Sequence, residues 1–552
     1  MAVIMRRVFA ILLVSFPAGP RLALSQAESS LVSLRIDPLL IAEAAEVWTL
    51  IAAPENRIWP GWNASDTPLL FYLPGEQDVL INHPRPPEGF VPYTGAVRFP
   101  GGRIFVRDGA TIIDSDGQNT SRDVAGISTL VVADRLSNLR LNLRFKMRAW
   151  LENPRRPEEK APGFAELATD PYDQLALVVH EAFHVFQGRA APLKSANEML
   201  LLYYPVLSVE NNVGFAQEGA ALASALRARD RATLRAGVVK WLALRQQRRS
   251  GLRSEAVAYE DGVEFGEGLA KYAEYRLFEV LQGSTPAPAM QWAQGFSGYG
   301  DLDLRRDRLI GRMVEHMRGE VPVNNDPYGA APLRMRLYFS GMAIGALLDR
   351  LSQDWKRRIL EPGTSLTGLA QEAVQASPSE TRHALEEARR DSDYQALVVA
   401  KTQLGEAGRA RIDAMVEEIE HGEGTGIVVD YAALEPPNAA MAFSPFGITV
   451  VDEDRTIFSQ VPIKVRLAGG AEVVQRAPRP LLLDKRRKLV RFRLLRTLTR
   501  EDVDRASGLQ ATAPDRVTGV ALELPEFAFR APRAQLRWEG KDLRIVLQPP
   551  EK

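Results

Sequence analysis

The chain has 552 residues, too many for one ordinary hydrophobic core, and its 45% hydrophobic and 25% charged residues are typical of a folded, soluble protein. Lys and Arg number 69 and Asp and Glu number 69, so no net charge favours nucleic acid or an anionic membrane as a partner. The absence of Cys excludes disulfides and leaves His, Asp and Glu as the strong metal ligands.

The first residues have the pattern of an export signal. Arg6 and Arg7 precede an apolar stretch over residues 8–16, and small residues at 23–25 suit a cleavage site. An uncleaved anchor is the alternative, but about nine apolar residues are too few for a bilayer core that takes roughly 20. We therefore expect a signal peptide over residues 1–25 and an exported protein, periplasmic or secreted, with no integral membrane segment after cleavage.

The next part of the sequence predicts a small unit over residues 26–160, built of one helix and several strands. Helical apolar spacing runs from residue 37 to about 53, where Pro54 ends it. Short apolar runs such as residues 69–73 then alternate with Pro and Gly turns. A charged, Pro-containing link at residues 152–163 ends this unit.

The remaining chain divides into a helical part and a strand-rich part. Helical spacing continues from residue 170 to about 421, which predicts a helical domain over residues 161–423. Short strand-like runs, among them residues 463–467 and 543–547, then predict a C-terminal β-sandwich-like or barrel-like domain over residues 424–552. The expected fold class is α+β and multidomain.

One predicted helix carries the chemistry. Asp170 suits the N-cap, Pro171 the first helical position and Gly188 the left-handed residue after the last turn, which predicts a helix of about 17 residues. His180 and His184 are four residues apart, so both imidazoles project from one face and can reach one ion.

Glu181 lies on the adjacent edge of that helix, where its carboxylate can act as a general base on water activated by zinc. The alternative is a buried helix whose His residues only satisfy backbone carbonyls. Burying two His and a Glu without a metal would cost a few kcal/mol for each unsatisfied group. The pattern therefore favours a zinc site with His180 and His184 as ligands.

A zinc site of this kind needs a third protein ligand. No His lies between residues 185 and 200, so downstream carboxylates are the candidates. Glu218 and Glu267 both begin a Glu-Gly-x-Ala pattern. In both, we expect the small residue after the carboxylate to let the backbone approach the metal-binding helix closely.

The stretch HEAFH at residues 180–184, followed by EGLAKYAEY at 267–275, resembles the gluzincin zinc metallopeptidases. It is also similar to uncharacterised bacterial zincin-like proteins with an HExFHxxQ helix. The resemblance is specific over residues 172–275 and fainter at 82–87 and 338–343. It implies a mainly helical zincin-like core, and Glu267 in preference to Glu218 as the third zinc ligand.

The chain departs from that family in two ways. Gly266 stands where the similar proteins often carry Asn, and Glu267 lies 83 residues after His184 (267 minus 184), more than in thermolysin-like enzymes. An inserted helical hairpin over residues 211–259 would account for this separation and would place Glu218 near the same site.

Other candidate residues rest on weaker signals. Glu264, one turn before Glu267, could orient a His ligand, although the acidic run Glu260, Asp261 and Glu264 is more typical of a solvated helix face. Tyr338 could stabilise the oxyanion, as a phenol does in several gluzincins, or could be a core residue. The remaining His residues have no partner at ligand spacing and are expected to be structural or exposed: His83, His316, His383 and His421.

The expected function is zinc-dependent hydrolysis of peptide bonds, with a peptide or protein as substrate and Glu181 as general base. Two alternatives stay open. One is a catalytically inactive zincin-like exported protein that binds a cell-envelope partner. The other is a purely structural or adhesive exported protein without a metal.

Overall fold

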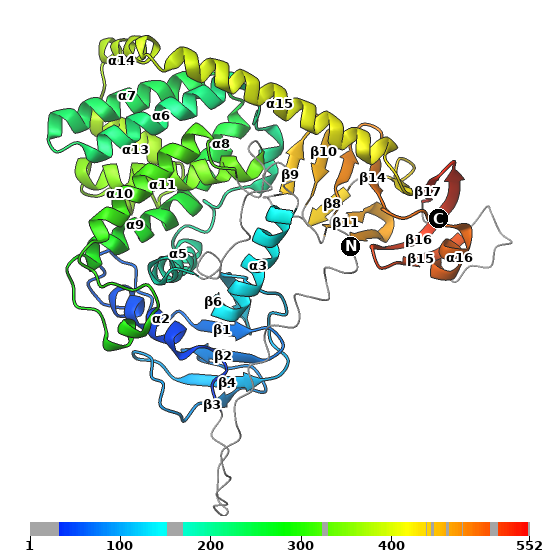
Figure 1. Cartoon of the computed structure of the whole chain (residues 1–552), viewed down its shortest axis with the longest axis horizontal. Helices are drawn as coiled ribbons and strands as arrows, with labels where there is room; N and C mark the ends of the chain where they lie inside the picture. Colours follow the sequence, from blue (N-terminus) through cyan, green and yellow to red (C-terminus); the bar gives the residue numbers. More distant parts are fainter. Residues whose placement is uncertain are drawn as a thin grey trace, which may run out of the picture.

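The computed structural model describes residues 33–151, 169–322, 329–437, 439–442, 447–459, 463–476, 479–507 and 517–549. The predicted signal peptide, residues 1–25, and the predicted link at residues 152–163 lie outside these ranges. The described chain forms a sheet near its start, a large assembly of helices, and a second sheet near its end (Figure 1). The predicted α+β class is therefore confirmed.

Six strands among the described residues form the N-terminal sheet, in the order β3-β4-β2-β1-β6-β5. They are β1 (Leu69–Leu73), β2 (Gln77–Ile81), β3 (Val91–Pro92), β4 (Ile104–Asp108), β5 (Thr120–Val124) and β6 (Ile127–Ala133), preceded by α2 (Pro38–Ile51) and followed by α3 (Arg135–Leu151). β1 pairs in parallel with β6 and antiparallel with β2. Strand β1 is apolar and buried throughout because it lies between these two neighbours and is covered on both faces.

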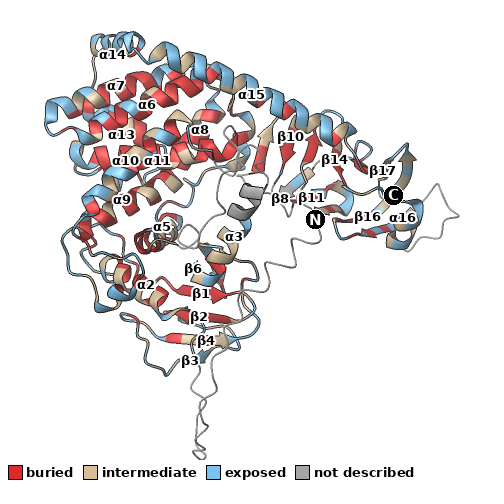
Figure 2. Ribbon diagram, viewed as in Figure 1, coloured by how far each residue is buried: buried red, intermediate tan, exposed pale blue. Residues whose placement is uncertain are grey.

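Between residues 171 and 421, every element in the described part of the chain is helical. The elements are α5 (Pro171–Ala190), η1 (Glu198–Tyr203), α6 (Val209–Arg227), α7 (Arg231–Arg249), α8 (Ser254–Val263), η2 (Glu264–Gly268), α9 (Leu269–Leu281), η3 (Pro288–Trp292), α10 (Leu302–Arg318), α11 (Ala330–Leu351), α12 (Trp355–Arg358), α13 (Leu366–Val374), α14 (Pro378–Arg390) and α15 (Tyr394–His421). Helices α6 and α7 pack against each other within the predicted inserted segment. Figure 2 shows α11 and α13 largely buried and α15 largely exposed. Within the described ranges, no helix combines the length and hydrophobicity needed to cross a membrane.

An aromatic cluster joins the N-terminal region to helix α5. The ring of Trp59 lies 5.0 Å from that of Phe183 and 5.2 Å from that of Trp355, and the ring of Trp62 lies 5.2 Å from Phe183. Burial of such rings contributes most of the packing energy at a contact of this kind. One cluster of buried apolar side chains includes residues from all three predicted units, so these units share a continuous core.

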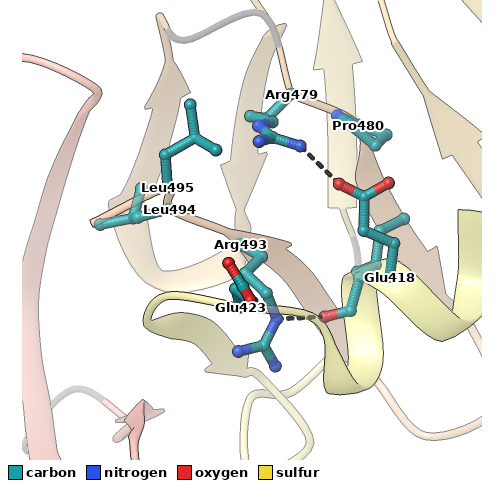
Figure 3. A pocket seen from close by; sticks show the side chains of 8 residues that line it. Glu418, Glu423, Arg479, Pro480, Arg493, Leu494 and Leu495 are labelled. Carbon is teal, nitrogen blue, oxygen red and sulfur yellow. Dashed lines mark hydrogen bonds and ion pairs between the residues drawn. The ribbon is translucent and has the colours of Figure 1, made fainter. Parts of the chain in front are cut away.

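Helix α15 connects the helical region to the C-terminal sheet (Figure 1). Its last turn is held by Arg493, which donates to the carbonyls of Ile419 at 3.3 Å and Glu420 at 2.7 Å. Such contacts satisfy carbonyls that have no partner inside the helix. Figure 3 shows Arg493 and the ion pair between Glu418 and Arg479 lining a pocket of about 260 Å³ at this junction.

The C-terminal strands form one curled sheet, so of the two expected arrangements it is closer to the barrel-like one than to the sandwich. In the described residues it has eleven strands, in the order β8-β11-β12-β16-β17-β7-β14-β13-β10-β9, with β15 paired to β16. The strands are β7 (Gly426–Asp430), β8 (Ala439–Ala442), β9 (Ile448–Val450), β10 (Arg455–Phe458), β11 (Ile463–Leu467), β12 (Ala471–Gln475), β13 (Leu481–Asp484), β14 (Leu489–Arg493), β15 (Val517–Glu523), β16 (Phe527–Glu539) and β17 (Asp542–Leu547), with η5 (Ala468–Gly470) and α16 (Arg500–Ser507).

The chain connections explain why this sheet curls. Strands β8 and β9 lie at opposite ends of the sheet, yet only residues 443–447 separate them along the chain. Six Cα–Cα steps lead from Ala442 to Ile448 and span at most about 22 Å, so the two ends of the sheet must approach each other. Alternating apolar residues predict strands with one buried face, but they do not distinguish two stacked sheets from one sheet that curls over its own core.

Candidate metal centre

Helix α5 presents His180 and His184 from one face. The Asp170 carboxylate caps it by accepting from the Tyr172 N–H at 2.8 Å, and Pro171 opens the first turn, as predicted. The predicted end at Gly188 is wrong, because the helix continues to Ala190. Gly188 does not have a positive φ, and the helix ends at its C-cap, Ala191, without a left-handed residue.

Glu267 comes from a second element, the π-helical turn η2, which lies between α8 and α9. Wider turns of this kind are rare and occur often at functional sites. Gly268, the next residue, packs against α11: a Cβ built on it would lie 2.7 Å from the Cα of Gly341. The predicted close approach is therefore made to α11 and not to the helix that carries the two histidines.

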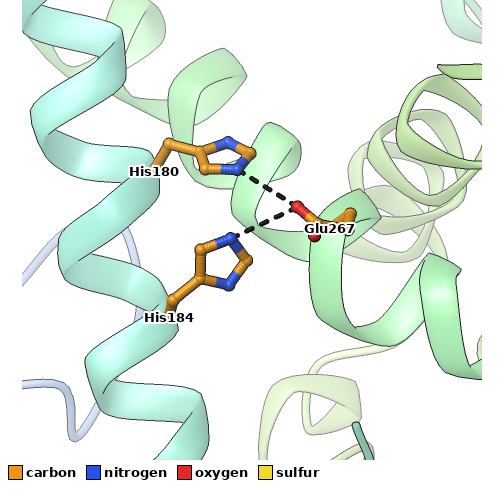
Figure 4. A group of neighbouring side chains, drawn as sticks. All are labelled: His180, His184 and Glu267. Atoms are coloured by element: carbon orange, nitrogen blue, oxygen red, sulfur yellow. Dashed lines mark ion pairs between the residues drawn. The ribbon is translucent and has the colours of Figure 1, made fainter. Parts of the chain in front are cut away.

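The three side chains converge on one point (Figure 4). Oε2 of Glu267 lies 3.4 Å from Nε2 of His180 and 3.3 Å from Nε2 of His184. In a tetrahedral zinc site with bonds of about 2.0–2.1 Å, two ligand atoms lie about 3.3–3.4 Å apart. The observed separations are those of two edges of such a tetrahedron. His184 and Glu267 keep 23% and 22% of their side-chain surface exposed, so the centre is open to solvent.

Glu218, the alternative third ligand, lies elsewhere. Its two carboxylate oxygens bind Arg245 Nε at 2.9 Å and Arg248 Nε at 2.5 Å, and the carboxylate is fully buried. Burial would raise the pKa of Glu218, but the charges of the two arginines outweigh burial and lower it. The inserted hairpin therefore does not bring this carboxylate to the histidines.

Both histidines are held in the tautomer that binds a metal through Nε2. Nδ1 of His180 lies 2.7 Å from Oε1 of Glu274, and Nδ1 of His184 lies 3.0 Å from Oε1 of Gln187. A carboxylate or amide oxygen accepts, so Nδ1 carries the hydrogen in each ring and Nε2 faces Glu267. Lys271 in turn binds the second oxygen of Glu274 at 2.6 Å. The donor set fits a metal ion.

The carboxylate of Glu267 is oriented from its other side by Arg334 on α11. The guanidinium donates to Oε1 of Glu267 at 3.0 Å and also pairs with Glu198. This leaves Oε2 as the oxygen that faces the two histidines. Burial would raise the pKa of Glu267, but hydrogen bonds from His180 and His184 outweigh it and hold the pKa far below its usual range.

The predicted general base and the predicted oxyanion donor both lie beside this centre. Burial raises the pKa of Glu181, and the charges of His180 and His184 oppose that rise only in part. The ring of Tyr338 stacks on that of His180, with centroids 6.0 Å apart, and its hydroxyl is hydrogen-bonded to Glu267. A carboxylate with a raised pKa is suited to accept and return a proton near neutral pH.

The acidic run before Glu267 has neither of the two predicted roles. Glu264 binds Arg245 at 2.7 and 2.9 Å and accepts from Ser340, so it contacts neither histidine. Glu260 is fully buried against Arg248 and Arg249, so this face is not solvated. These contacts hold the chain on both sides of η2.

The other predicted structural histidines lie away from the centre. His83 is buried, with Nε2 3.0 Å from the carbonyl of Val124, and His316 is buried against Phe339. Burial, with the charges of nearby cations, lowers the pKa of His316 to about 4. His383 and His421 are exposed.

Sequence reasoning gave no role to three residues of the centre, namely Gln187, Glu274 and Arg334. Spacing along the sequence could have pointed to Gln187 and Glu274. Gln187 follows His184 by three residues, and Glu274 follows Glu267 by seven, so each lies one or two turns from a ligand on the same helical face. Arg334 comes from a distant helix, and no local pattern points to it.

Comparisons of the chain with protein-family models, with curated proteins and with solved structures find no match.

Proposed function

We propose that this protein is a zinc-dependent hydrolase of the gluzincin type that cleaves peptide bonds. The observation that carries the proposal is the convergence of His180 Nε2, His184 Nε2 and Glu267 Oε2, in which the carboxylate oxygen lies 3.3–3.4 Å from each imidazole nitrogen and all three atoms lie within 4.8 Å of one another. Glu181 lies on the same helix as the two histidines. Two imidazoles and one carboxylate are a donor set that catalytic zinc sites use, with the fourth position left for water. A zinc ion held there would supply an acidified water and a Lewis acid for the substrate carbonyl.

The residues of the chain then have distinct roles in the proposed reaction. Glu181 accepts the proton that water loses as its oxygen attacks the carbonyl carbon, and returns it to the amine nitrogen when the C–N bond breaks. Burial raises the pKa of Glu181 above its usual value, which makes its carboxylate a better proton acceptor than an exposed glutamate. Tyr338 donates to the developing oxyanion after its hydroxyl leaves Glu267.

The proposed substrate is a peptide or protein outside the cytoplasm. The sequence pattern of residues 1–25 supports export, and peptide hydrolysis follows from the likeness of HEAFH and EGLAKYAEY to the gluzincins. Mass spectrometry of the protein recovered from the cell envelope and medium tests export. A mature chain that begins near residue 26 supports it, and an intact start contradicts it.

Glu181→Gln tests the proposed reaction. The amide keeps the shape of the side chain but cannot accept a proton, so we expect stoichiometric zinc and a loss of peptide hydrolysis of at least about 100-fold. Zinc is measured by elemental analysis, and cleavage with a mixed peptide library. Glu210→Gln, on the exposed start of α6, is the matched control and should keep both. Full activity in the Glu181 variant would remove the general base, and a wild-type protein that binds zinc without cleaving any peptide would favour the inactive alternative.

A further inference from the structure

Gln187 contacts both halves of the candidate metal centre, which are the histidines on α5 and the turn η2 that carries Glu267. It follows His184 by one helical turn on α5, and only 5% of its surface is exposed. Its Nε2 donates to the main-chain carbonyls of Phe265 at 2.6 Å and Gly266 at 3.0 Å. Its Oε1 lies 3.0 Å from Nδ1 of His184.

These partners fix the orientation of the amide. A main-chain carbonyl can only accept, so the NH₂ group of Gln187 must face Phe265 and Gly266. The oxygen then faces His184, whose Nδ1 must carry a hydrogen, and Nε2 is the ring nitrogen that faces Glu267. The tautomer of His184 therefore depends on carbonyls that belong to another helix.

The same two carbonyls belong to η2, the turn that carries Glu267. Phe265 and Gly266 directly precede this ligand, so the two hydrogen bonds from Gln187 hold the turn against α5. The main chain at Gly268 packs closely against α11. The amide thus links the histidine ligands to the carboxylate ligand through one buried group.

We propose that Gln187 is a positioning residue that couples the two halves of the metal centre, setting the tautomer of His184 and the distance of η2 from α5. This inference rests on the proposed metal-dependent function. It goes beyond that function because it assigns two separable tasks to one side chain. Removing either task should weaken metal binding.

Two substitutions separate the tasks. Gln187→Met has similar length and removes both the acceptor and the donor. Gln187→Glu keeps the acceptor for His184 but, at about pH 8 where a carboxyl is ionised, has no hydrogen to give the carbonyls. If Gln187 couples the two halves, both variants should bind zinc about 10- to 100-fold more weakly than wild type.

The measurement is zinc affinity of the full-length, metal-free protein by competition with a chelating dye, together with the visible spectrum of the cobalt-loaded protein, which reports ligand geometry. Gln174→Met is the matched control, because Gln174 is also a buried glutamine on α5 but does not contact the centre. It should keep wild-type affinity and spectrum. The melting temperature of each metal-free variant shows whether the fold itself has changed.

Each outcome decides the proposal. Weak binding by both variants, with an altered cobalt spectrum, supports it. Wild-type affinity in Gln187→Glu overturns the coupling and leaves Gln187 as a partner of His184 alone, and this variant decides the question even if Gln187→Met does not fold. Wild-type affinity in both variants rejects any positioning role. A wild-type protein that binds no zinc overturns the proposed function itself, and the coupling with it.

Discussion

His180 lies between two carboxylates, with Glu274 at one ring nitrogen and Glu267 at the other. Burial alone would lower the pKa of this imidazole. The hydrogen bonds to Glu267 and Glu274, with the charges of Glu274 and Glu181, outweigh burial and raise the pKa to about 10. In the metal-free protein at neutral pH, His180 is therefore expected to carry a hydrogen on both nitrogens, and a metal bound as proposed would replace the one on Nε2.

We expect zinc binding to tighten as pH rises. Because His180 releases one proton for each zinc bound, the apparent Kd should fall about tenfold per pH unit between about pH 7 and 9. Titration calorimetry in buffers of different ionisation enthalpy measures the proton released. Glu274→Gln should lower the pKa of His180 and flatten this dependence, whereas Glu279→Gln, on the exposed side of the same helix, should leave it unchanged. An affinity that does not vary with pH would contradict this account.

Protonation of His180 also affects the free energy of unfolding of the metal-free protein. The pKa of His180 is higher in the folded protein, at about 10, than the value of 6.5 for a free side chain. Its stabilising contribution is therefore complete below about pH 6.5 and is lost as pH rises toward about 10. Urea unfolding of the metal-free protein across this range should show the decline, and addition of zinc should remove it.

The histidine pair and Glu181 could be predicted because one helix brings them together, so spacing alone fixes their geometry. The third ligand could not be chosen on the same ground, since Glu218 and Glu267 share one local pattern. What separates them is Arg245 and Arg248 on α7, which neutralise Glu218 in the folded protein. Arg334 was missed for the same reason, because its contact with Glu267 exists only after α11 packs against η2.

At the scale of elements, the centre depends on how closely η2 approaches α11. A Cβ at Gly268 would lie 2.7 Å from the Cα of Gly341 and 3.0 Å from the carbonyl oxygen of Leu337, and neither main-chain atom can rotate away. A Cβ at Gly266, two residues earlier, would meet no atom within 4 Å. The two glycines of one turn thus differ in what a methyl group would encounter.

Gly268→Ala should destabilise the protein by about 1–3 kcal/mol through overpacking, and should weaken zinc binding by moving Glu267. Gly266→Ala is the matched control: its methyl group has room, and replacing a helical glycine should leave the free energy of unfolding unchanged or raise it by about 0.5–1 kcal/mol. Urea unfolding and zinc titration of both variants check this. Equal stability of the two variants would show that the contact with α11 is not tight.

At the scale of the whole molecule, helix α5, which carries His180 and His184, lies within a core shared with the N-terminal region. Phe183, next to the histidine pair, packs on Trp59 and Trp62, which precede the first sheet. A change in the stability of α5 should therefore reach the aromatic cluster. Fluorescence of these tryptophans is a natural probe of events at the centre.

Removing zinc with a chelator should lower the melting temperature, and excess zinc should restore it. With free zinc at about 100 times Kd, the stabilisation is about 2.7 kcal/mol. Tryptophan fluorescence and calorimetry should show the same shift, because the aromatic cluster and α5 share one core. The melting temperature of Glu267→Gln, which lacks the third ligand, should respond far less to zinc. If zinc binding is measured but the melting temperature of the wild-type protein does not change with zinc, the proposed coupling between zinc binding and stability is contradicted.

The helical middle of the chain and its two strand-rich flanks were predictable because apolar periodicity separates helix from strand. The curl of the second sheet was not. It follows from the pairing of β12 with β16 and of β7 with β17, and from the placement of β8 and β9 at opposite ends of the sheet, which depend on contacts between segments far apart in the sequence. The shared core was missed because a composition change along the chain says nothing about packing between the parts.

Helix α15 has 28 residues, so it extends about 42 Å without a break. A flexible connector would let the second sheet reorient independently. Here the connector is a continuous helix whose last turn is hydrogen-bonded to Arg493 of the sheet, so it holds the sheet in a fixed orientation. The curled sheet would thus be held at a set distance and angle from the proposed metal centre. The distance between the helical region and the C-terminal sheet is then set by the number of turns in α15. Inserting or deleting one turn would change that distance by about 5.4 Å.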